Sequence, residues 1–339
     1  MNGLGTADDV LVEKRGRAGL LTLNRPEAMN ALTAGMVETL TQALEQWRED
    51  PDVDLVIIRG AGDRGLCAGG DIAALYRDAR ENPEANDTFF REEYALNRMI
   101  ADYPKPYVAV MDGIVLGGGV GVSAHGSHRI VTEASRVGMP EVGIGFAPDV
   151  GGSWLLAQAP DLLGLHLALT GTHVGAGPAL EAGLADHYVE KQNLDQLLED
   201  LCRTGDAASV AGYAGPAPDG LAERTGIAQI YNAPDVEEIL RRLDAADTDW
   251  ARRAASRIRA ASPLAVRVAW EAQRRIRERG LTLADALDQE LRVAQTLPRH
   301  PDFVEGVRAR IIDKDRSPQW RPATLAEVPD STVAAIFQD

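Results

Sequence analysis

The sequence predicts an α/β protein with a helical C-terminal region, and three observations lead to this prediction. Within residues 1–204, short apolar stretches typical of strands alternate with stretches of helical period. Glycine-rich turns join several of these stretches, which indicates strands linked by helical crossovers. Residues 205–219 are rich in Gly, Ala and Pro, and residues 220–339 are charged and helical in pattern. We therefore expect a core over 1–204, a linker over 205–219 and a helical region over 220–339.

Local patterns place the elements of the core in order. Thr33 is expected to cap a helix whose apolar side chains recur on one face as far as Trp47. The polar stretch 77–87 contains Asn and Pro, so we expect an irregular connection that could move over a site. Apolar runs and turn residues predict four strands, over 19–24, 53–58, 107–111 and 129–132. A further helix is predicted over 90–100.

Composition and charge narrow the class of protein. The 339 residues are 45% apolar, which is enough for a large core. The sequence contains no run of eighteen or more apolar residues, the length needed to span a membrane. The formal net charge of −16 argues against nucleic acid as a partner. The polar segment from Met1 to Asp9 resembles neither a signal peptide nor a transit peptide, so the expected location is the cytoplasm.

Neither a disulfide framework nor a metal site is expected. The two cysteines, Cys67 and Cys202, lie far apart in the sequence and have no clustered partners. His125 and His128 have the spacing of two ligands on one helix face, but a third ligand with suitable spacing is missing nearby. We therefore predict no metal and no separate cofactor.

Two glycine-rich loops could carry chemistry, because each follows a predicted strand directly. They are Cys67-Ala68-Gly69-Gly70-Asp71 and Gly117-Gly118-Gly119. Two such loops can aim backbone N–H groups at one oxygen and form an oxyanion hole, although either could also be a tight turn needed only for packing. The spacing excludes a dinucleotide-binding G-x-G-x-x-G, and no phosphate loop or G-x-S-x-G nucleophile elbow is present.

Three carboxylates are candidates for a role near these loops. Glu141 lies among apolar and small residues, where burial would raise its pKa toward that of a general base. Asp149 precedes Gly151-Gly152 and has an alternative role as the cap of a following helix. Glu93 has an alternative role on a solvated helix face, paired with Arg91 or Arg98.

Several motifs, taken in order along the chain, resemble the enoyl-CoA hydratase/isomerase (crotonase) superfamily. They are residues 23–32, Cys67–Asp71, Pro104-Lys-Pro106, Leu116–Gly119 and Met139-Pro-Glu141. The resemblance implies a spiral of ββα units. It also implies an oxyanion hole formed by backbone N–H groups around Ala68–Gly69 and at Gly118. The adenosine end of CoA is expected near Arg25–Asn30 and Ala68–Asp71.

A narrower set of motifs resembles the 3-hydroxyisobutyryl-CoA hydrolase branch of that superfamily, which belongs to valine degradation. This set comprises residues 89–94, 117–123, 148–152, 302–308, 312–315 and 318–320. The resemblance implies that Glu141, Asp149 and Gly118 act in catalysis and that Glu93, Ala68, Gly69, Gly70 and Asp71 contact the substrate. CoA enters as part of an acyl-CoA substrate, and a homo-oligomer is possible.

One glycine favours hydrolysis over hydration. Hydratases of the superfamily use two glutamates, one matching Glu141 and the other at the position of Gly121 in this chain. Water addition to a double bond needs both an acid and a base, so Gly121 shifts the prediction toward thioester hydrolysis. The alternatives are an enoyl-CoA hydratase or isomerase on the same fold and a non-catalytic CoA-binding protein.

Overall fold

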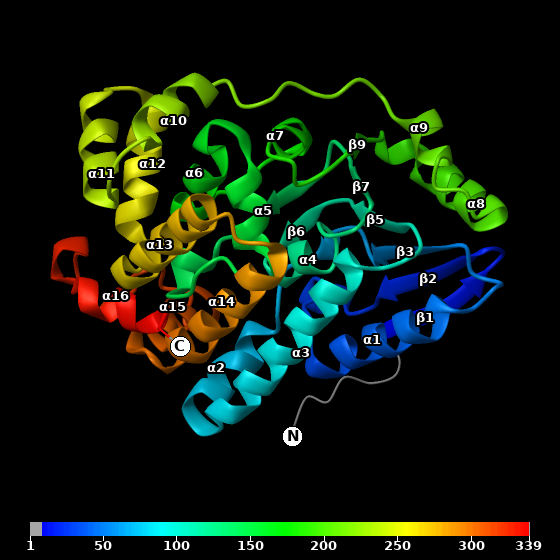
Figure 1. The fold of residues 1–339 in the computed structure, drawn as a ribbon, viewed down its shortest axis with the longest axis horizontal. Helices are drawn as coiled ribbons and strands as arrows, with labels where there is room; N and C mark the ends of the chain where they lie inside the picture. Colours follow the sequence, from blue (N-terminus) through cyan, green and yellow to red (C-terminus); the bar gives the residue numbers. More distant parts are fainter. Residues whose placement is uncertain (1–8, 339) are drawn as a thin grey trace. The chain divides into compact units, whose positions relative to one another are not determined.

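The computed structural model describes residues 9–338, which contain a six-stranded sheet and a three-stranded sheet (Figure 1). In the larger sheet, β1 and β2 form an antiparallel pair and the remaining neighbours are parallel. Its strands, in spatial order, are β1 (Val10–Arg15), β2 (Ala18–Leu23), β3 (Leu55–Gly60), β5 (Tyr107–Met111), β7 (His128–Val131) and β9 (His187–Tyr188). Four of these strands overlap the four predicted from sequence, which confirms those predictions.

The smaller sheet is parallel and shows how the chain spirals. Its strands, in spatial order, are β4 (Gly65–Cys67), β6 (Ile114–Leu116) and β8 (Arg136–Gly138). Each turn of the chain adds one strand to the large sheet and the next to the small one, as in β3–β4, β5–β6 and β7–β8. This repetition, with helices between the strand pairs, confirms the expected spiral of ββα units.

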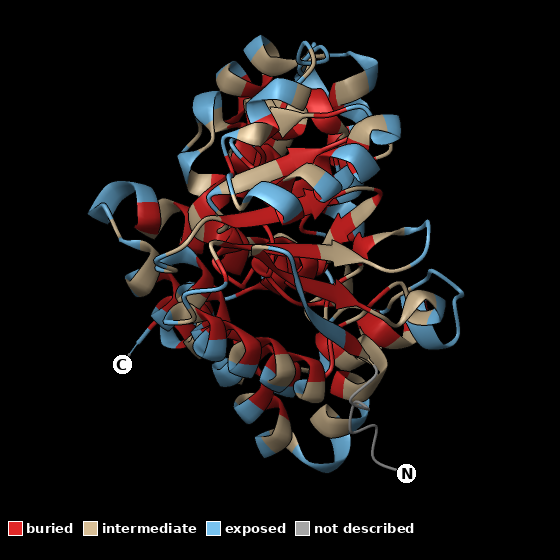
Figure 2. Ribbon diagram, turned by 90° about the vertical axis from the view of Figure 1, so that its right-hand side faces the viewer, coloured by how far each residue is buried: buried red, intermediate tan, exposed pale blue. Residues whose placement is uncertain are grey.

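The large sheet has an apolar interior, as the buried strands in Figure 2 show. One face packs against α8 (Leu194–Thr204) through Leu197, Leu198 and Leu201, and α9 (Ser209–Tyr213) adds Val210. The predicted cap of α1 (Ala34–Arg48) is present, because Met36 N–H donates to Thr33 Oγ1 at 3.3 Å. The apolar residues that form the predicted face of that helix are all buried; they are Met36, Val37, Leu40, Ala43, Leu44 and Trp47.

The described chain divides into two compact units whose segments interleave along the sequence. The sheet unit comprises the described residues up to Asp71, then Glu92–Gly138 and Val174–Gly220. The helical unit comprises Ile72–Arg91, Met139–His173 and the described residues from Leu221 onward. The predicted division of the chain into a core up to 204 and a helical region from 220 differs from these two units, because residues 72–91 and 139–173 cluster with the C-terminal helices. The predicted linker 205–219 also contains α9.

The sheet unit also contains α4 (Gly118–Gly121) and α7 (Ala176–Glu181), and the boundary between the units falls within α3 (Pro83–Ala101). In the helical unit, α5 packs against α6, α13 and α14. The helices of that unit are α2 (Ile72–Glu81), α5 (Gly152–Gln158), α6 (Leu163–Thr170), α10 (Arg224–Tyr231), α11 (Val236–Ala245), α12 (Asp249–Ala260), α13 (Pro263–Arg279), α14 (Leu283–Thr296), α15 (Pro301–Val307) and α16 (Asp330–Ile336). Among residues 9–338, no helix is both long and apolar enough to cross a membrane.

The prediction of an irregular stretch over 77–87 was wrong. Apart from Asn82, these residues are helical: 77–81 belong to α2 and 83–87 to α3. Pro83 begins α3, a position where its missing N–H costs nothing. Asn86 is buried and donates through Nδ2 to Leu75 O at 3.0 Å, which joins the two helices. The prediction about targeting signals in Met1 to Asp9 falls mainly outside the described residues.

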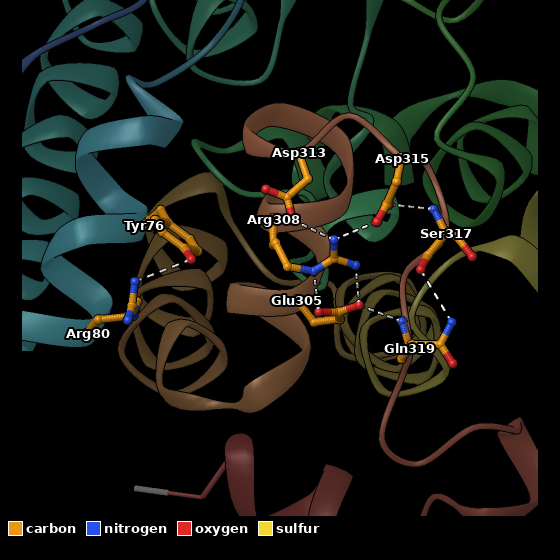
Figure 3. Close-up of polar contacts among 8 residues, drawn as sticks. All are labelled: Tyr76, Arg80, Glu305, Arg308, Asp313, Asp315, Ser317 and Gln319. Atoms are coloured by element: carbon orange, nitrogen blue, oxygen red, sulfur yellow. Dashed lines mark hydrogen bonds and ion pairs between the residues drawn. The ribbon is translucent and has the colours of Figure 1, made fainter.

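Arg308 organises the segment that follows α15 (Figure 3). Its guanidinium group binds both carboxylate oxygens of Glu305 at 2.8 Å and also contacts Asp313 at 2.8 Å and Asp315 at 2.6 Å. Glu305 in turn accepts the Gln319 N–H at 2.7 Å. One cation therefore ties the turn over 313–319 to α15. The hydrogen bond from Arg308 is the main cause of the lowered pKa of both Glu305 and Asp315.

Replacing Arg308 with Met should lower the melting temperature by about a degree or two and speed proteolysis within 313–319, because three carboxylates of a surface network lose their shared cation. Acids with a lowered folded-state pKa stabilise the fold above their ordinary pKa, and this contribution is lost as the pH falls through the lowered values. The difference between variant and wild type should therefore shrink in acid, as thermal melts from pH 7 to pH 3 would show. Arg316→Met, in the same segment, is the control; an equal loss there would contradict the assignment.

Candidate active site

The two predicted glycine-rich loops come together within the sheet unit. They follow β4 and β6, which are neighbours in the small sheet. Gly69 has φ 110°, and a Cβ built on it would lie 3.8 Å from Gly118 N. A Cβ on Gly118 would lie 3.3 Å from Gly70 N, and one on Gly119 only 2.4 Å from Cys67 O. Glycine is thus required because the two backbones approach each other closely.

The amides of these loops have different surroundings. Ala68 N–H donates to Met29 O at 3.0 Å, so this amide is engaged within the protein. Gly69 N–H has a longer contact of 3.4 Å with Cys67 Sγ. Gly118 is the first residue of α4, where amide groups find no acceptor inside the helix. Gly118 and the Gly69–Gly70 segment are therefore better placed than Ala68 to offer N–H groups to a ligand.

Glu93 lies beside this convergence and is buried. Only 2% of Glu93 is exposed, and its Oε1 lies 2.6 Å from where a Cβ on Gly118 would be. The alternative role on a solvated helix face is excluded by this burial, and Arg98 pairs with Asp102 instead. A carboxylate, Gly118 and Gly70 thus meet at one point of the sheet unit.

The two segments expected near the adenosine end of CoA are also joined. Arg25 donates to Asp71 Oδ2 at 3.1 Å and to Ala31 O at 2.6 Å. Leu32 N–H donates to Gly69 O, and Asp71 N–H donates to Leu32 O, both at 2.8 Å. The structure therefore connects Arg25–Asn30 with Ala68–Asp71, as the prediction requires, although their contact with CoA stays a prediction.

Glu141 belongs to the helical unit, where it begins a short 3₁₀ helix over Glu141–Ile144. It is 8% exposed, and its carbonyl accepts Phe146 N–H at 3.1 Å. The turn is anchored from α13, because Ser262 N–H donates to Val142 O at 3.1 Å. Ser262 Oγ also donates to the buried Asp302 at 2.6 Å. Glu141 is therefore a buried acid on a firmly held turn.

Asp149 precedes α5 and is 6% exposed. Gly151, and not Asp149, occupies the cap position of α5, and Asp149 O accepts Gly152 N–H at 2.6 Å. Val150 and Gly151 both adopt left-handed conformations, with φ 53° and 75°. For Val150 this costs on the order of 1–3 kcal/mol, which the surroundings must offset.

The residues that support the Asp149 turn were missed by sequence reasoning. Glu290 of α14 accepts hydrogen bonds from Gly151 and Ser153, and Gln273 of α13 donates to Ser153 O. A signal existed, because Glu290 occupies the apolar face of α14 between Ala286 and Val293. An acid at such a position is unusual and indicates a buried partner.

Gly121 occupies the position where hydratases of the superfamily are expected to carry their second glutamate. Gly121 ends α4 and is buried in the sheet unit with Gly118 and Val120. A glutamate there would be needed for the acid and base pair of a hydratase. The carboxylate found beside Gly118 comes instead from Glu93 on α3.

Comparison with known proteins agrees with this architecture. Residues 18–337 match the Enoyl-CoA hydratase/isomerase family, and the chain belongs to that family. Among curated relatives, the mitochondrial 3-hydroxyisobutyryl-CoA hydrolase of Danio rerio is 39% identical, over 97% of this chain and 89% of the relative. The mitochondrial 3-hydroxyisobutyryl-CoA hydrolase of Homo sapiens is 38% identical, over 98% and 89%.

Two solved structures are similar over nearly the whole chain. A carnitinyl-CoA dehydratase from Mycobacterium thermoresistibile has a TM-score of 0.94 at 46% identity and covers 98% of this chain and 97% of its own. An enoyl-CoA hydratase from Rhodobacter sphaeroides 2.4.1 has a TM-score of 0.92 at 41% identity and covers 97% of both chains. The similar proteins thus carry names from two reaction classes. One class is thioester hydrolysis, and the other is the addition or removal of water at a double bond.

Proposed function

We propose that this protein hydrolyses the thioester of a short 3-hydroxyacyl-CoA, with 3-hydroxyisobutyryl-CoA as the favoured substrate. The observation that carries the proposal is the composition of the site. A buried Glu141 is present, whereas Gly121 stands where a hydratase needs its second glutamate. The names of the curated relatives at 38–39% identity support the same reaction and a place in valine catabolism.

The proposed mechanism begins with the thioester carbonyl bound by the Gly118 N–H and a second N–H from Gly69–Gly70. Glu141 either attacks this carbonyl to form a mixed anhydride or removes a proton from the attacking water. In both routes the C–S bond breaks and CoA leaves as a thiol after protonation. In the first route, water then hydrolyses the anhydride, which releases the hydroxy acid and regenerates the Glu141 carboxylate; in the second, the attacking water supplies an oxygen of the hydroxy acid directly. Each N–H donor contributes about 3 kcal/mol to the transition state.

The order of the residues along the chain supports placing Glu141 in this mechanism. Gly117 N–H donates to Gly138 O at 3.2 Å, next to Gly118. Glu141 follows Gly138 by three residues. The donor loop and the proposed acid are therefore tied to the same short stretch of chain.

Asp149 and Glu93 are proposed to bind the 3-hydroxyl of the acyl group. Buried polar groups that bind a hydroxyl reject analogues that lack it, because the groups then stay unsatisfied. No cofactor beyond the CoA of the substrate is needed. A cytoplasmic location and a possible homo-oligomer complete the proposal; the curated relatives are named as mitochondrial, so subcellular fractionation would decide the location.

Replacing Asp149 with Ala should reduce selectivity for the hydroxyl rather than all activity. We expect kcat/KM to fall by about 10²-fold or more for 3-hydroxyisobutyryl-CoA and much less for isobutyryl-CoA. Steady-state thiol release from both esters measures the ratio. Equal losses on the two substrates would remove Asp149 from recognition of the hydroxyl.

An enoyl-CoA hydratase is the second candidate, because both similar solved structures carry names of that reaction type. It would convert crotonyl-CoA without releasing a thiol. Gly121 is the feature against it, because water addition would then need Glu93 or Asp149 as the second acid. Loss of the enoyl absorbance of crotonyl-CoA, with no thiol release from 3-hydroxyisobutyryl-CoA, would favour this candidate.

A further inference from the structure

Two buried polar side chains from the C-terminal helices hold the turn that carries Asp149. Gly151 N–H donates to Glu290 Oε2 at 2.6 Å, and Ser153 N–H donates to Glu290 Oε1 at 3.1 Å. Ser153 Oγ donates to that same Oε1, and Gln273 Nε2 donates to Ser153 O at 2.7 Å. Glu290 and Gln273 are only 2% and 1% exposed. Both oxygens of Glu290 thus bind the two residues that flank Gly152.

This support is needed because the turn does not hold itself. Val150 and Gly151 are both left-handed, and α5 begins without a side chain of its own to accept its first amides. Glu290 supplies these acceptors from α14, across 139 residues of sequence. The conformation of the residues after Asp149 therefore depends on a carboxylate from a distant helix.

A capping role alone does not explain why this residue is an acid. Burying an acid is costly, and a Ser or Asn could accept the same amides at a smaller cost. The pKa of Glu290 is raised to about 8, mainly by burial and to a smaller extent by the nearby Asp149, while the three hydrogen bonds oppose the rise. Asp149 thus lies close enough for the two carboxylates to interact, and buried acids of this kind cluster at functional sites.

We infer that Glu290 is a positioning residue for Asp149, which it holds in place through Gly151 and Ser153 so that the enzyme distinguishes hydroxylated acyl groups from plain ones. The inference rests on the proposed function, and it gives the C-terminal helices a part in substrate selection. Gln273 supports the same turn from α13.

Glu290→Gln is the sharpest test. Both Glu290 oxygens accept N–H groups, so an amide nitrogen at either place would face a donor and the turn would shift. We expect the ratio of kcat/KM for 3-hydroxyisobutyryl-CoA over isobutyryl-CoA to fall by about tenfold or more, since small misplacements have effects of this size. Asp288→Asn, on the exposed side of α14, is the matched control and should leave the ratio unchanged.

A double-mutant comparison separates positioning from general stability. If Glu290 acts through Asp149, then Glu290→Gln should not change the ratio further in an Asp149→Ala enzyme. Ser153→Ala removes only the hydroxyl donor and should shift the ratio in the same direction by a smaller factor, which provides a test if Glu290→Gln does not fold.

The outcomes distinguish this inference from the proposed function. A wild-type enzyme that releases no thiol overturns the proposed function, and the positioning role with it. A selective wild type with an unchanged ratio in folded Glu290→Gln overturns the positioning role alone. So does a loss of the same size with and without Asp149. If Glu290→Gln does not fold, an unchanged ratio in Ser153→Ala overturns it.

Discussion

Glu141→Gln is expected to reduce thiol release from 3-hydroxyisobutyryl-CoA by at least about 10³-fold, because an amide can neither attack the thioester nor take a proton from water. Glutamine keeps the size of the side chain, and the turn over Glu141–Ile144 is held by backbone contacts from Phe146 and Ser262. Binding of a non-hydrolysable CoA thioether should therefore be nearly unchanged. Steady-state kinetics and calorimetric titration measure the two effects separately.

Glu199→Gln, on the exposed face of α8, is the control, because it makes the same Glu-to-Gln change at a surface position outside the proposed site. It should retain wild-type kinetics. Activity within tenfold of wild type in Glu141→Gln would remove Glu141 from the mechanism. Loss of CoA-thioether binding together with activity would instead assign it a role in binding.

Gly118→Ala is expected to lower kcat by about 10²–10³-fold, the usual effect of losing one oxyanion donor. The added Cβ would lie 2.6 Å from Glu93 Oε1 and 3.1 Å from Leu32 Cδ1, so the loop must move. Because the donor N–H belongs to the same residue, even a small movement takes it off its target. Kinetics of thiol release measure the loss.

A second variant shows whether the loss comes from the donor or from the clash. Glu93 is itself proposed to bind the substrate, so Glu93→Ala alone is the reference. Glu93→Ala in the Gly118→Ala enzyme removes the nearest atom and should restore thermal stability, while kcat stays well below that of Glu93→Ala alone. Gly212→Ala is the control, because a Cβ there meets nothing within 4 Å and its φ is ordinary. A kcat in the double variant equal to that of Glu93→Ala alone would show that Gly118 serves packing only.

Much of the fold could be predicted because its signals are local. Thr33 and the apolar residues after it define α1 by cap and period alone, and the buried strands show as apolar runs. The segment 77–87 failed for an equally local reason. Its polar residues suggested a loop, yet Pro83 is suited to the first turn of a helix and Asn86 binds across to Leu75.

The supports of the site could not be predicted in the same way. Glycines in the two loops indicated close backbone approach, and the structure brings Gly69, Gly70 and Gly118 together. Glu290 could not be linked to Asp149, because 141 residues separate them and no local pattern encodes such a contact. The interleaving of the two units was hidden for the same reason, since spatial clustering is not a property of neighbouring residues.

The central claim, that the protein is a hydrolase selective for a short 3-hydroxyacyl-CoA, is tested most directly by following free thiol. Purified enzyme would be incubated separately with 3-hydroxyisobutyryl-CoA, isobutyryl-CoA and crotonyl-CoA in the presence of a thiol-reactive dye. We predict rapid thiol release from the first ester, little from the second and an unchanged enoyl absorbance with the third. Loss of the enoyl absorbance without thiol release from any ester would contradict the account.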